Sequence, residues 1–283
     1  MAGELEAAVA DHYEVSELES RLVAALEAAG VDLSDIKPQD LAPVDEFHIG
    51  GRPATVHAIS KLSLTPDHHV LDVGCGIGGA ARYIASQIGC RVTGIDLTPS
   101  YIEAARAFAT RTGLQERLKF EVASALDMPF DDGEFDAAVT FHVAMNIKDR
   151  EGLYREIGRV LKPGAEFCIY DVMKGENEGL IYPVPWAETE QTSHVTSPDE
   201  MHALLDAAGF DVVDTQDRTE FGIAFFKERL AAVAEGQPAV GLHLLMGRTS
   251  KPKFENVLRN LEAGHVAPVL MLADRKSVVR ERV

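Results

Sequence analysis

Hydrophobic residues near the N-terminus recur at helical spacing, three or four positions apart. Residues 11–29 follow this pattern with leucine and valine on one face, and Gly30 closes the segment, which predicts a helix. A polar stretch that contains proline follows over residues 31–45. Residues 47–62 open with a glycine-containing turn and then predict a second helix, with Pro53 in its first turn.

From residue 67 onward, short apolar runs alternate with amphipathic segments. Such runs, each followed by a helical pattern, are typical of parallel strands joined by crossover helices. The predicted strands are residues 69–73, 90–95, 118–122, 135–141 and 166–172. The predicted helices between them are residues 80–88, 100–111 and 150–161. We therefore expect an α/β fold with a doubly wound, Rossmann-like, mostly parallel sheet.

The last third of the chain is less regular. An insert rich in proline and aromatic residues spans residues 179–198. Helices are then predicted at residues 199–208, 221–235 and 253–263, and strands at residues 210–214 and 267–274. The basic end, residues 275–283, is expected to fray and carries no functional weight. The expected organisation is an N-terminal helical cap over residues 1–66, a domain over 67–275 with an insert at about 174–198, and a tail over 276–283.

Composition and charge restrict the partners. The 283 residues include 45 Asp and Glu against 27 Lys and Arg, a net charge of -18, which disfavours binding to nucleic acid. No apolar run approaches the roughly 20 residues of a membrane span, and the acidic N-terminus does not resemble a signal peptide. Cys75, Cys90 and Cys168 have no metal-binding spacing. We expect a reduced, cytoplasmic chain with no metal, no membrane partner and no disulfide framework. The oligomeric state stays open.

A glycine-rich segment directly follows the first predicted strand. Gly74, Gly76 and Gly79 fit the spacing G-x-G-x-x-G, and the acidic residue Asp96 stands about 20 positions after Gly76. Glycines in such a turn let the backbone approach a ligand closely, at the N-terminus of a helix. The spacing is that of a nucleotide-binding loop, although a plain strand-to-helix turn has the same appearance.

Asp72 narrows the choice of nucleotide. Its carboxylate lies two residues before the first glycine, where it would repel the pyrophosphate of a dinucleotide. It would attract an ammonium group, which S-adenosylmethionine carries together with a sulfonium and no phosphate. Asp96 at the end of the second predicted strand suits the ribose hydroxyls. The alternative for Asp72 is a helix-capping carboxylate.

These motifs together resemble those of class I S-adenosylmethionine-dependent methyltransferases. The residues that carry the resemblance are 72–79, 94–96, 125–130, 135–136 and 161–164. The resemblance implies a seven-stranded sheet whose last strand is antiparallel. It also implies cofactor contacts at Asp72, Gly74, Cys75, Gly76, Asp96, Leu97, Ser124, Ala125 and His142. Many relatives have an acid that reaches the adenine amino group where Ser124 stands here.

A second resemblance extends over nearly the whole chain. Residues 45–55, 182–187 and 261–264 are similar to the sarcosine/dimethylglycine methyltransferase-like branch, which is akin to phosphoethanolamine N-methyltransferases. That branch acts on small amines. The resemblance implies a small soluble methyl acceptor, with the nitrogen of an amine or amino acid favoured and an oxygen or carbon acceptor as the alternative.

Candidate catalytic and acceptor-binding residues follow from their places in the predicted fold. His142, at the carboxyl end of the fourth predicted strand, stands where a base or orienting group would reach the methyl. Candidate acceptor-binding residues are His48, Met145, Asn146, Tyr182 and Trp186. The two aromatic rings would attract a methylammonium group, or else pin the insert to the core. His48 and Asn146 would otherwise belong to helix-capping turns.

Charged residues leave further alternatives open. Asp171 and Glu188 would counter a cationic acceptor, and Arg52 would meet an acceptor carboxylate. Two other functions stay open as alternatives. One is an NAD-dependent oxidoreductase, which Asp72 disfavours, and the other is a non-catalytic cofactor-binding scaffold.

Overall fold

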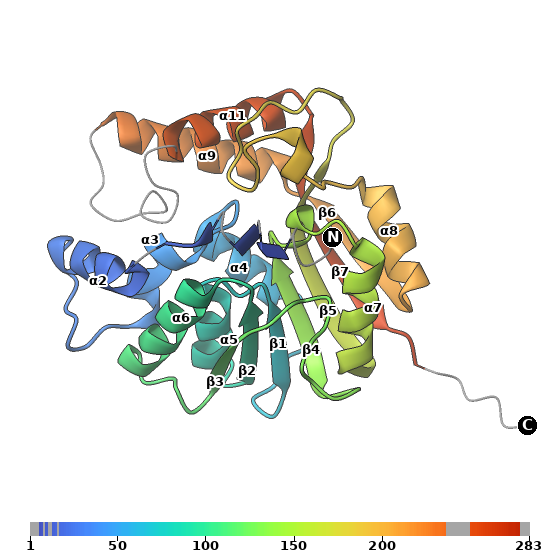
Figure 1. Cartoon of the computed structure of the whole chain (residues 1–283), viewed down its shortest axis with the longest axis horizontal. Coiled ribbons are helices and arrows are strands. Elements are labelled where there is room, and N and C mark those ends of the chain that lie inside the picture. The colour runs from blue at the N-terminus through green and yellow to red at the C-terminus, as the bar shows by residue number, and fades with distance from the viewer. Residues whose placement is uncertain (1–5, 8, 11–12, 16, 236–249, 278–283) are drawn as a thin grey trace, which may run out of the picture.

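The computed structural model describes residues 6–7, 9–10, 13–15, 17–235 and 250–277. Its centre is one seven-stranded sheet in the order β3-β2-β1-β4-β5-β7-β6 (Figure 1). The strands are β1 (His69–Val73), β2 (Arg91–Asp96), β3 (Leu118–Val122), β4 (Phe135–Phe141), β5 (Leu161–Lys174), β6 (Phe210–Asp217) and β7 (Val266–Arg275). The first five pair in parallel, while β7 runs antiparallel to both β5 and β6. The expected doubly wound, mostly parallel sheet with an antiparallel last strand is confirmed.

Helices cover both faces of this sheet. They are α2 (Leu18–Ala28), α3 (Ala42–Asp45), α4 (Gly51–Ile59), α5 (Gly79–Gln87), α6 (Pro99–Arg111), α7 (Arg150–Val160), α8 (Pro198–Ala207), α9 (Thr219–Ala234) and α11 (Ser250–Glu262). Short 3-10 helices are η1 (Pro38–Leu41), η2 (Ala144–Asn146) and η3 (Glu190–Thr192). One apolar core joins α4, α5 and α6 to one face of the sheet, and a second joins α7 and α8 to the other.

Alternating side chains in the strands explain this two-sided packing. In β1, Val70 belongs to the core under α4 to α6, whereas Leu71 and Val73 belong to the core under α7 and α8. Successive side chains of a strand point to opposite faces, so a fully apolar strand must be covered on both sides. The continuous apolar runs in the sequence are therefore what a buried parallel sheet requires.

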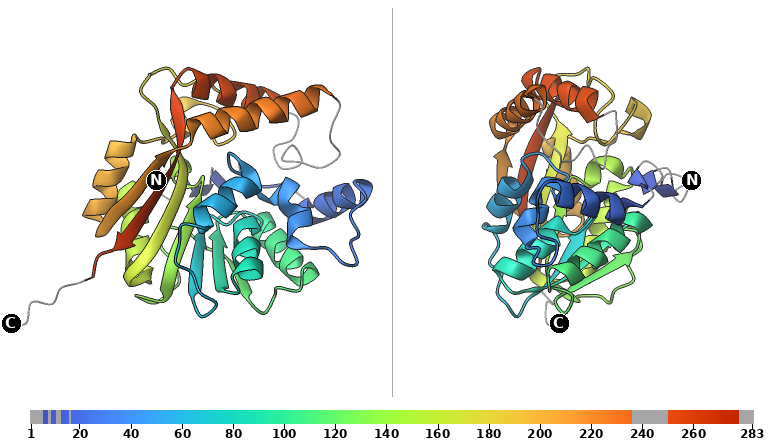
Figure 2. Two further views of the ribbon diagram at one scale, coloured as in Figure 1. Left: turned by 180° about the vertical axis from the view of Figure 1, so that it is seen from behind. Right: turned by 90° about the vertical axis from the view of Figure 1, so that its left-hand side faces the viewer.

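Two further elements lie over the edge where the parallel strands end. On one side, α2 packs its leucines against Tyr101 and Phe108 of α6. On the other, the antiparallel pair α9 and α11 crosses above the strands, next to the insert that follows β5 (Figure 2). Helices α2, α9 and α11 therefore partly cover the carboxyl ends of β1, β2 and β4.

Several boundaries differ from the sequence prediction. The helix expected over residues 11–29 begins at Leu18 in the described chain, because Glu17 takes a left-handed backbone conformation (φ 54°) that interrupts it. Residues 11, 12 and 16 lie outside the described residues. Strand β5 is longer than the predicted 166–172, since its antiparallel pairing with β7 continues to Lys174. Strand β6 continues past residue 214 to Asp217 for the same reason.

The basic end of the chain is better ordered at its start than expected. Arg275 is part of β7, where its guanidinium donates hydrogen bonds to the carbonyls of Gly158 and Gly209. Lys276 pairs with Asp206 and Asp211 on the surface. The prediction of a frayed segment from residue 275 is therefore wrong for its first two residues, and residues 278–283 lie outside the described residues.

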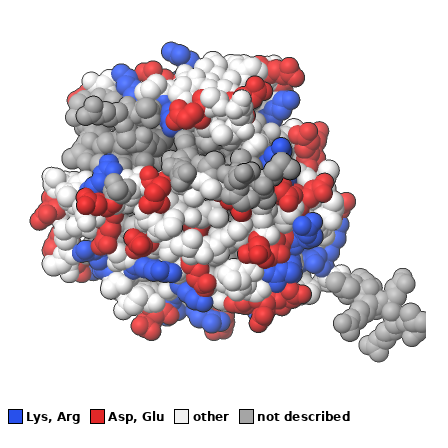
Figure 3. Space-filling view, in the orientation of Figure 1, with Lys and Arg blue, Asp and Glu red and all other residues white. Residues whose placement is uncertain are grey.

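Charge is spread over the surface. Figure 3 shows acidic and basic side chains interspersed over one face of the molecule. Among the described residues, no helix is both long and apolar enough to cross a membrane.

Candidate active site

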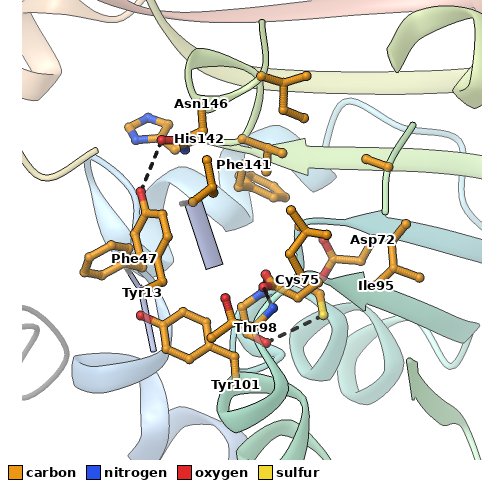
Figure 4. A pocket seen from close by; sticks show the side chains of 18 of the residues that line it. Tyr13, Phe47, Asp72, Cys75, Ile95, Thr98, Tyr101, Phe141, His142 and Asn146 are labelled. Carbon is orange, nitrogen blue, oxygen red and sulfur yellow. Dashed lines mark hydrogen bonds between the residues drawn. The ribbon is translucent and has the colours of Figure 1, made fainter. Parts of the chain in front are cut away.

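A cavity of about 750 Å³ opens at the carboxyl ends of β1, β2 and β4. This is the position at which open α/β sheets bind ligands, and the volume is in the usual range for ligand pockets. Its walls include the glycine loop after β1, the ends of β2 and β4, and the N-terminal segment that carries Tyr13 and Phe47 (Figure 4). The cavity is therefore formed by the segments that carry the sequence motifs together with the predicted cap.

Asp72 lies at the bottom of this cavity and is only 1% exposed. Burial and, less strongly, the charge of Asp96 raise the pKa of its carboxyl to about 7, although the backbone N–H of Ala81 and the charge of Arg82 act to lower it. The second carboxylate oxygen, Oδ2, has no hydrogen-bond partner among the described residues. A buried carboxylate with an unused oxygen is costly unless a donor or cation reaches it. Asp72 itself belongs to β1, and the N-cap of α5 is Gly78, which has no side-chain capping bond, so the helix-capping alternative stays a prediction.

The glycine loop brings the chain close to β4. Gly74 has a left-handed conformation (φ 71°), and a Cβ there would lie 2.4 Å from Cγ2 of Val143. No side chain fits at this position without displacing the loop. Asp96 holds the same loop from the end of β2: its carboxylate accepts hydrogen bonds from Gly76 N–H (3.0 Å) and Thr98 N–H (2.9 Å). A carboxylate has room for further donors, so Asp96 remains able to accept ribose hydroxyls.

The far end of the cavity is apolar and lies after β3. Leu97 and Ala125 line it, as the resemblance implied, together with Ala123 and Leu126. Ser124 does not line it. Its hydroxyl donates to the carboxylate of Glu6 and accepts from Leu126 N–H, and Glu6 itself lines the cavity.

His142 lies directly after β4 in a left-handed conformation (φ 56°), which is uncommon for a residue other than glycine. Its backbone N–H donates to the carbonyl of Tyr170 over 2.7 Å, which fixes this turn. Burial lowers the pKa of its imidazole well below the usual value, so the ring is neutral. Nε2 is buried and has no hydrogen-bond partner within the part of the chain that is described. Strained backbone and an unused polar atom are both common at functional sites.

A small apolar extension of about 40 Å³ adjoins the main cavity. Tyr13, Phe47, His48 and His142 line both spaces. The remaining walls of the extension come from apolar and aromatic residues: Ile49, Met145, Pro185, Trp186, Phe225, Phe226, Phe254 and Val257. Of the residues that the structure describes, none of those in its walls is an Asp, Glu, Lys or Arg.

The candidate acceptor-binding residues divide between these spaces. Met145 and Trp186 line the extension, Asn146 lines the main cavity and His48 lines both. Tyr182 lines neither. The indole of Trp186 is 4% exposed and donates to Ser193 Oγ over 3.0 Å, so it also pins the insert to the core.

The three charged side chains considered for the acceptor are engaged elsewhere. Arg52 pairs with Glu46 (Nε to Oε1, 2.5 Å) and with Asp45. Asp171 is buried and accepts hydrogen bonds from Met145 N–H and Val172 N–H. Glu188 pairs with Lys253 over 2.6 Å. The two carboxylates and the guanidinium therefore already have partners within the protein, and none is assigned to the acceptor.

The aromatic residues of the extension were not among the residues predicted from the sequence. Phe225 and Phe226 lie on α9, and Phe254 on α11, about 80 to 110 residues after His142 in the chain. The phenylalanine pair inside a predicted helix was a signal, but its helical spacing is equally typical of a core. Tyr13 also lines both spaces, and its hydroxyl lies 3.5 Å from Asn146 Oδ1 (Figure 4).

The groups that line the main cavity, taken from one end to the other, suit S-adenosylmethionine. An unpartnered buried carboxylate lies at one end, a second carboxylate holds the glycine loop, and small apolar residues line the other end. These groups match an ammonium, two ribose hydroxyls and a base in turn. Asp72, Asp96, Leu97 and Ala125 would hold the cofactor.

Comparison with known proteins gives the same result. Residues 71–169 match the family model described as a methyltransferase domain. An O-methyltransferase, ResE, from Aspergillus sclerotiorum is 33% identical over 219 residues, which cover 75% of this chain and 81% of that protein. The sarcosine/dimethylglycine N-methyltransferase of Halorhodospira halochloris is 34% identical over 169 residues, 58% of this chain and 60% of that protein.

The fold has solved counterparts as well. Geranyl diphosphate C-methyltransferase from Streptomyces coelicolor A3(2), in complex with Mg²⁺, geranyl diphosphate and S-adenosyl-L-homocysteine, superposes with a TM-score of 0.70. The superposition covers 96% of this chain and 97% of that one, at 18% identity. The aligned segments span between 29% and 66% of the length of several other curated relatives. The relatives methylate nitrogen, oxygen and carbon, so they leave the acceptor atom open.

The sheet, the ordered motifs and the cavity agree with these matches, and they exclude the oxidoreductase alternative. The chain belongs to the class I S-adenosylmethionine-dependent methyltransferases and is an enzyme of that family.

Proposed function

We propose that this enzyme methylates the nitrogen of a small amine whose body is largely apolar. The observation that carries the proposal is the extension beside His142, whose described walls are aromatic and aliphatic. An apolar acceptor buried there gains roughly 25 cal/mol for each Å² removed from water. A zwitterionic amino acid would lose the hydration of a carboxylate with no cation in those walls to replace it.

Asp72 and Asp96 would anchor the cofactor in this proposal, and the glycine loop would keep its position by contact with β4. The bound cofactor supplies an electrophilic methyl group, which the lone pair of the acceptor takes while sulfur keeps the electrons of the old bond. The enzyme aligns the acceptor and excludes water, which is the main requirement for such a displacement. Tyr13 and Phe47 would close the cavity from the side of the cap, residues 1–66.

His142 would orient the acceptor. Its neutral ring lines both spaces, and its unpartnered Nε2 is available for a hydrogen bond. Met145 and Trp186 would contact the body of the acceptor, while Asn146 would contribute to the polar end of the cavity. The acceptor is thus a small molecule in this proposal. We also propose a cytoplasmic enzyme, because its three cysteines are free and buried.

A hydroxyl acceptor is the second candidate. It is favoured by one observation, the imidazole of His48 at the same junction with hydrogen-bonding partners behind it. A hydroxyl must lose its proton during methylation, whereas a neutral amine already presents a lone pair.

A panel of acceptors tests the proposal. The enzyme is incubated with S-adenosylmethionine and sarcosine, dimethylglycine, benzylamine, N-methylbenzylamine or 4-methylphenol, and methylated products are measured by mass. We expect kcat/KM for the benzylamines to exceed that for sarcosine by about tenfold or more, from about 1.4 kcal/mol of apolar burial. A preference for sarcosine or dimethylglycine would contradict the apolar acceptor, and a preference for 4-methylphenol would favour the second candidate.

A further inference from the structure

The two imidazoles at the junction of the cavities differ in what lies behind them. His48 and His142 line both spaces, and their ring centroids are 5.9 Å apart. Nε2 of His142 is buried without a partner in the described chain, whereas Nε2 of His48 contacts three polar groups. The difference indicates which ring is prepared to receive a proton.

The partners of His48 fix its tautomer. Nε2 lies 3.2 Å from the carbonyl oxygen of Gly51 and 3.1 Å from Thr55 Oγ1. A carbonyl can only accept a hydrogen bond, so Nε2 must carry the proton of the neutral ring. Nδ1 then holds an unshared electron pair, and it is the remaining polar atom of a side chain that lines both cavities. Burial lowers the pKa of His48 to about 3, which keeps this pair available.

The carboxylate of Glu46 lies next to the polar groups that contact Nε2 of His48. The hydroxyl of Thr55 donates to Glu46 Oε2 over 2.5 Å, and Oε2 lies 3.5 Å from Nε2 of His48. Glu46 and Thr55 are 2% and 0% exposed, so neither is screened by water. An imidazolium formed at His48 would therefore face a carboxylate directly and through one hydroxyl, in the arrangement by which carboxylates orient catalytic histidines.

We propose that His48 accepts the proton of the methyl acceptor, with Glu46 and Thr55 as positioning residues that hold its Nε2–H. The proposal rests on the function proposed above and extends it. As the acceptor atom bonds to the methyl carbon, its N–H or O–H bond breaks, the electron pair stays on the acceptor atom, and the proton moves to Nδ1. The enzyme would thus serve acceptors that present an N–H or O–H near His48, and it would not assist tertiary amines.

The charged groups around Glu46 should make the rate of the proposed proton transfer depend on pH. Burial and, less strongly, the charge of Asp45 raise the pKa of Glu46 to about 8, although Arg52, the Thr55 hydroxyl and Arg82 act to lower it. Nε of Arg52 lies 2.5 Å from Oε1 of this carboxylate, and Arg82 pairs with Asp45 at 2.8 Å. Glu46 assists His48 only when ionised, so kcat should rise as the pH passes through about 8.

The tautomer can be tested without any acceptor. In ¹⁵N NMR spectra of the histidine-labelled enzyme saturated with S-adenosylhomocysteine, we expect His48 as a neutral ring with the proton on Nε2. His48→Gln identifies the signal by its loss. A ring protonated on Nδ1, or on both nitrogens at neutral pH, would overturn the proposal even if the enzyme methylates its acceptor as proposed.

The role in the reaction is tested by kinetics with the faster of N-methylbenzylamine and 4-methylphenol. We expect His48→Gln to lower kcat by about 100-fold, the lower part of the usual range for removal of an acid–base group. Thr55→Val and Glu46→Gln should lower kcat by about tenfold and abolish its rise near pH 8, while Thr55→Ser, which keeps the hydroxyl, should restore both. The Kd of S-adenosylhomocysteine, by calorimetry, should stay within about twofold.

His202→Gln is the matched control, since this histidine lies on α8, is half-buried outside both cavity linings and bonds only to Thr215 Oγ1 among the contacts of the structure. It should leave kcat and its pH profile unchanged. Retention of more than about a third of kcat by His48→Gln, or an unaltered pH profile in Thr55→Val, would overturn the proposal. If neither probe is methylated by the wild-type enzyme, the proposed function fails, and the NMR result still decides the tautomer.

Discussion

The two ends of the active site are built in different ways. At the glycine-loop end, Asp72 and Asp96 lie close to each other in sequence, on neighbouring strands, and backbone N–H groups hold their carboxylates. At the other end, aromatic side chains from the insert, α9 and α11 meet around an apolar extension. The first end is polar and local, and the second is apolar and assembled from distant segments.

The difference shows how binding and selectivity are divided. The polar end uses a buried charge, which is expensive unless a cation completes it, and so it selects one kind of ligand group. If the acceptor binds at the apolar end as proposed, area and shape would select it by size and hydrophobicity, with little regard for the acceptor atom. Under the proposed function, this division would let one kind of cofactor site serve different acceptor atoms, and the relatives include N-, O- and C-methyltransferases.

The largest effect is expected from removing the charge at the polar end. Asp72→Asn should weaken binding of S-adenosylhomocysteine about 100-fold, because a charge-assisted hydrogen bond to a buried group is worth up to about 3 kcal/mol. Calorimetry measures the affinity. The unliganded variant should melt at or above the temperature of the wild type, since an unpaired buried charge is gone; a lower melting temperature with unchanged affinity would contradict the assignment.

A change of pH should act at the same end. The folded pKa of Asp72, about 7, is above the usual 3.8, so the stability linked to its protonation is lost as the pH rises through about 7. An ammonium group prefers the ionised carboxylate, so affinity for S-adenosylhomocysteine should fall roughly tenfold from about pH 8 to about pH 6. Calorimetry at both values checks this. In Asp72→Asn the dependence should disappear, and its persistence would assign the titration to another group.

A smaller effect is expected at the apolar end. Phe225→Ala removes a ring that packs edge-on against Phe226, with centroids 5.3 Å apart, and that lines the extension. KM for N-methylbenzylamine should rise about fivefold, from about 1 kcal/mol of lost contact, while the affinity for S-adenosylhomocysteine stays the same. Steady-state kinetics measure KM for the acceptor, and calorimetry measures the affinity for S-adenosylhomocysteine. An equal loss of both affinities would mean that the two ends are not independent.

The smallest effect is expected at Ser124. Its hydroxyl is already bonded to Glu6 and Leu126 N–H and does not line the cavity, so Ser124→Ala should change the cofactor affinity by less than about threefold. A loss of tenfold or more would show that the serine contacts the cofactor as the resemblance implied.

The polar end could be predicted from the sequence because its parts are local. Each strand begins and ends within a few residues of its apolar run, and the carboxyl ends of adjacent parallel strands meet at one edge. Asp72, the glycines and Asp96 are therefore placed by topology alone. His142 follows by the same rule, although its left-handed conformation does not.

The apolar end could not be predicted in the same way. Phe225 and Phe254 reach the site only because α9 and α11 pack as a pair above the strands, and no periodicity in the sequence fixes that orientation. Nor does sequence spacing reveal that Arg52 pairs with Glu46, which removes Arg52 from the residues that could meet an acceptor carboxylate. Tyr182 was expected at the site for its aromatic ring but does not line either cavity, since the turn of the insert directs Trp186 inward instead.

One calorimetric comparison tests the central claim, that the carboxylate of Asp72 selects the cofactor by its ammonium group. S-adenosylhomocysteine and its analogue without the α-amino group are titrated into the wild-type enzyme and into Asp72→Asn. We expect the analogue to bind the wild type about 100-fold more weakly than S-adenosylhomocysteine, and the two ligands to bind Asp72→Asn about equally. Equal affinity of the wild type for both ligands would contradict the account.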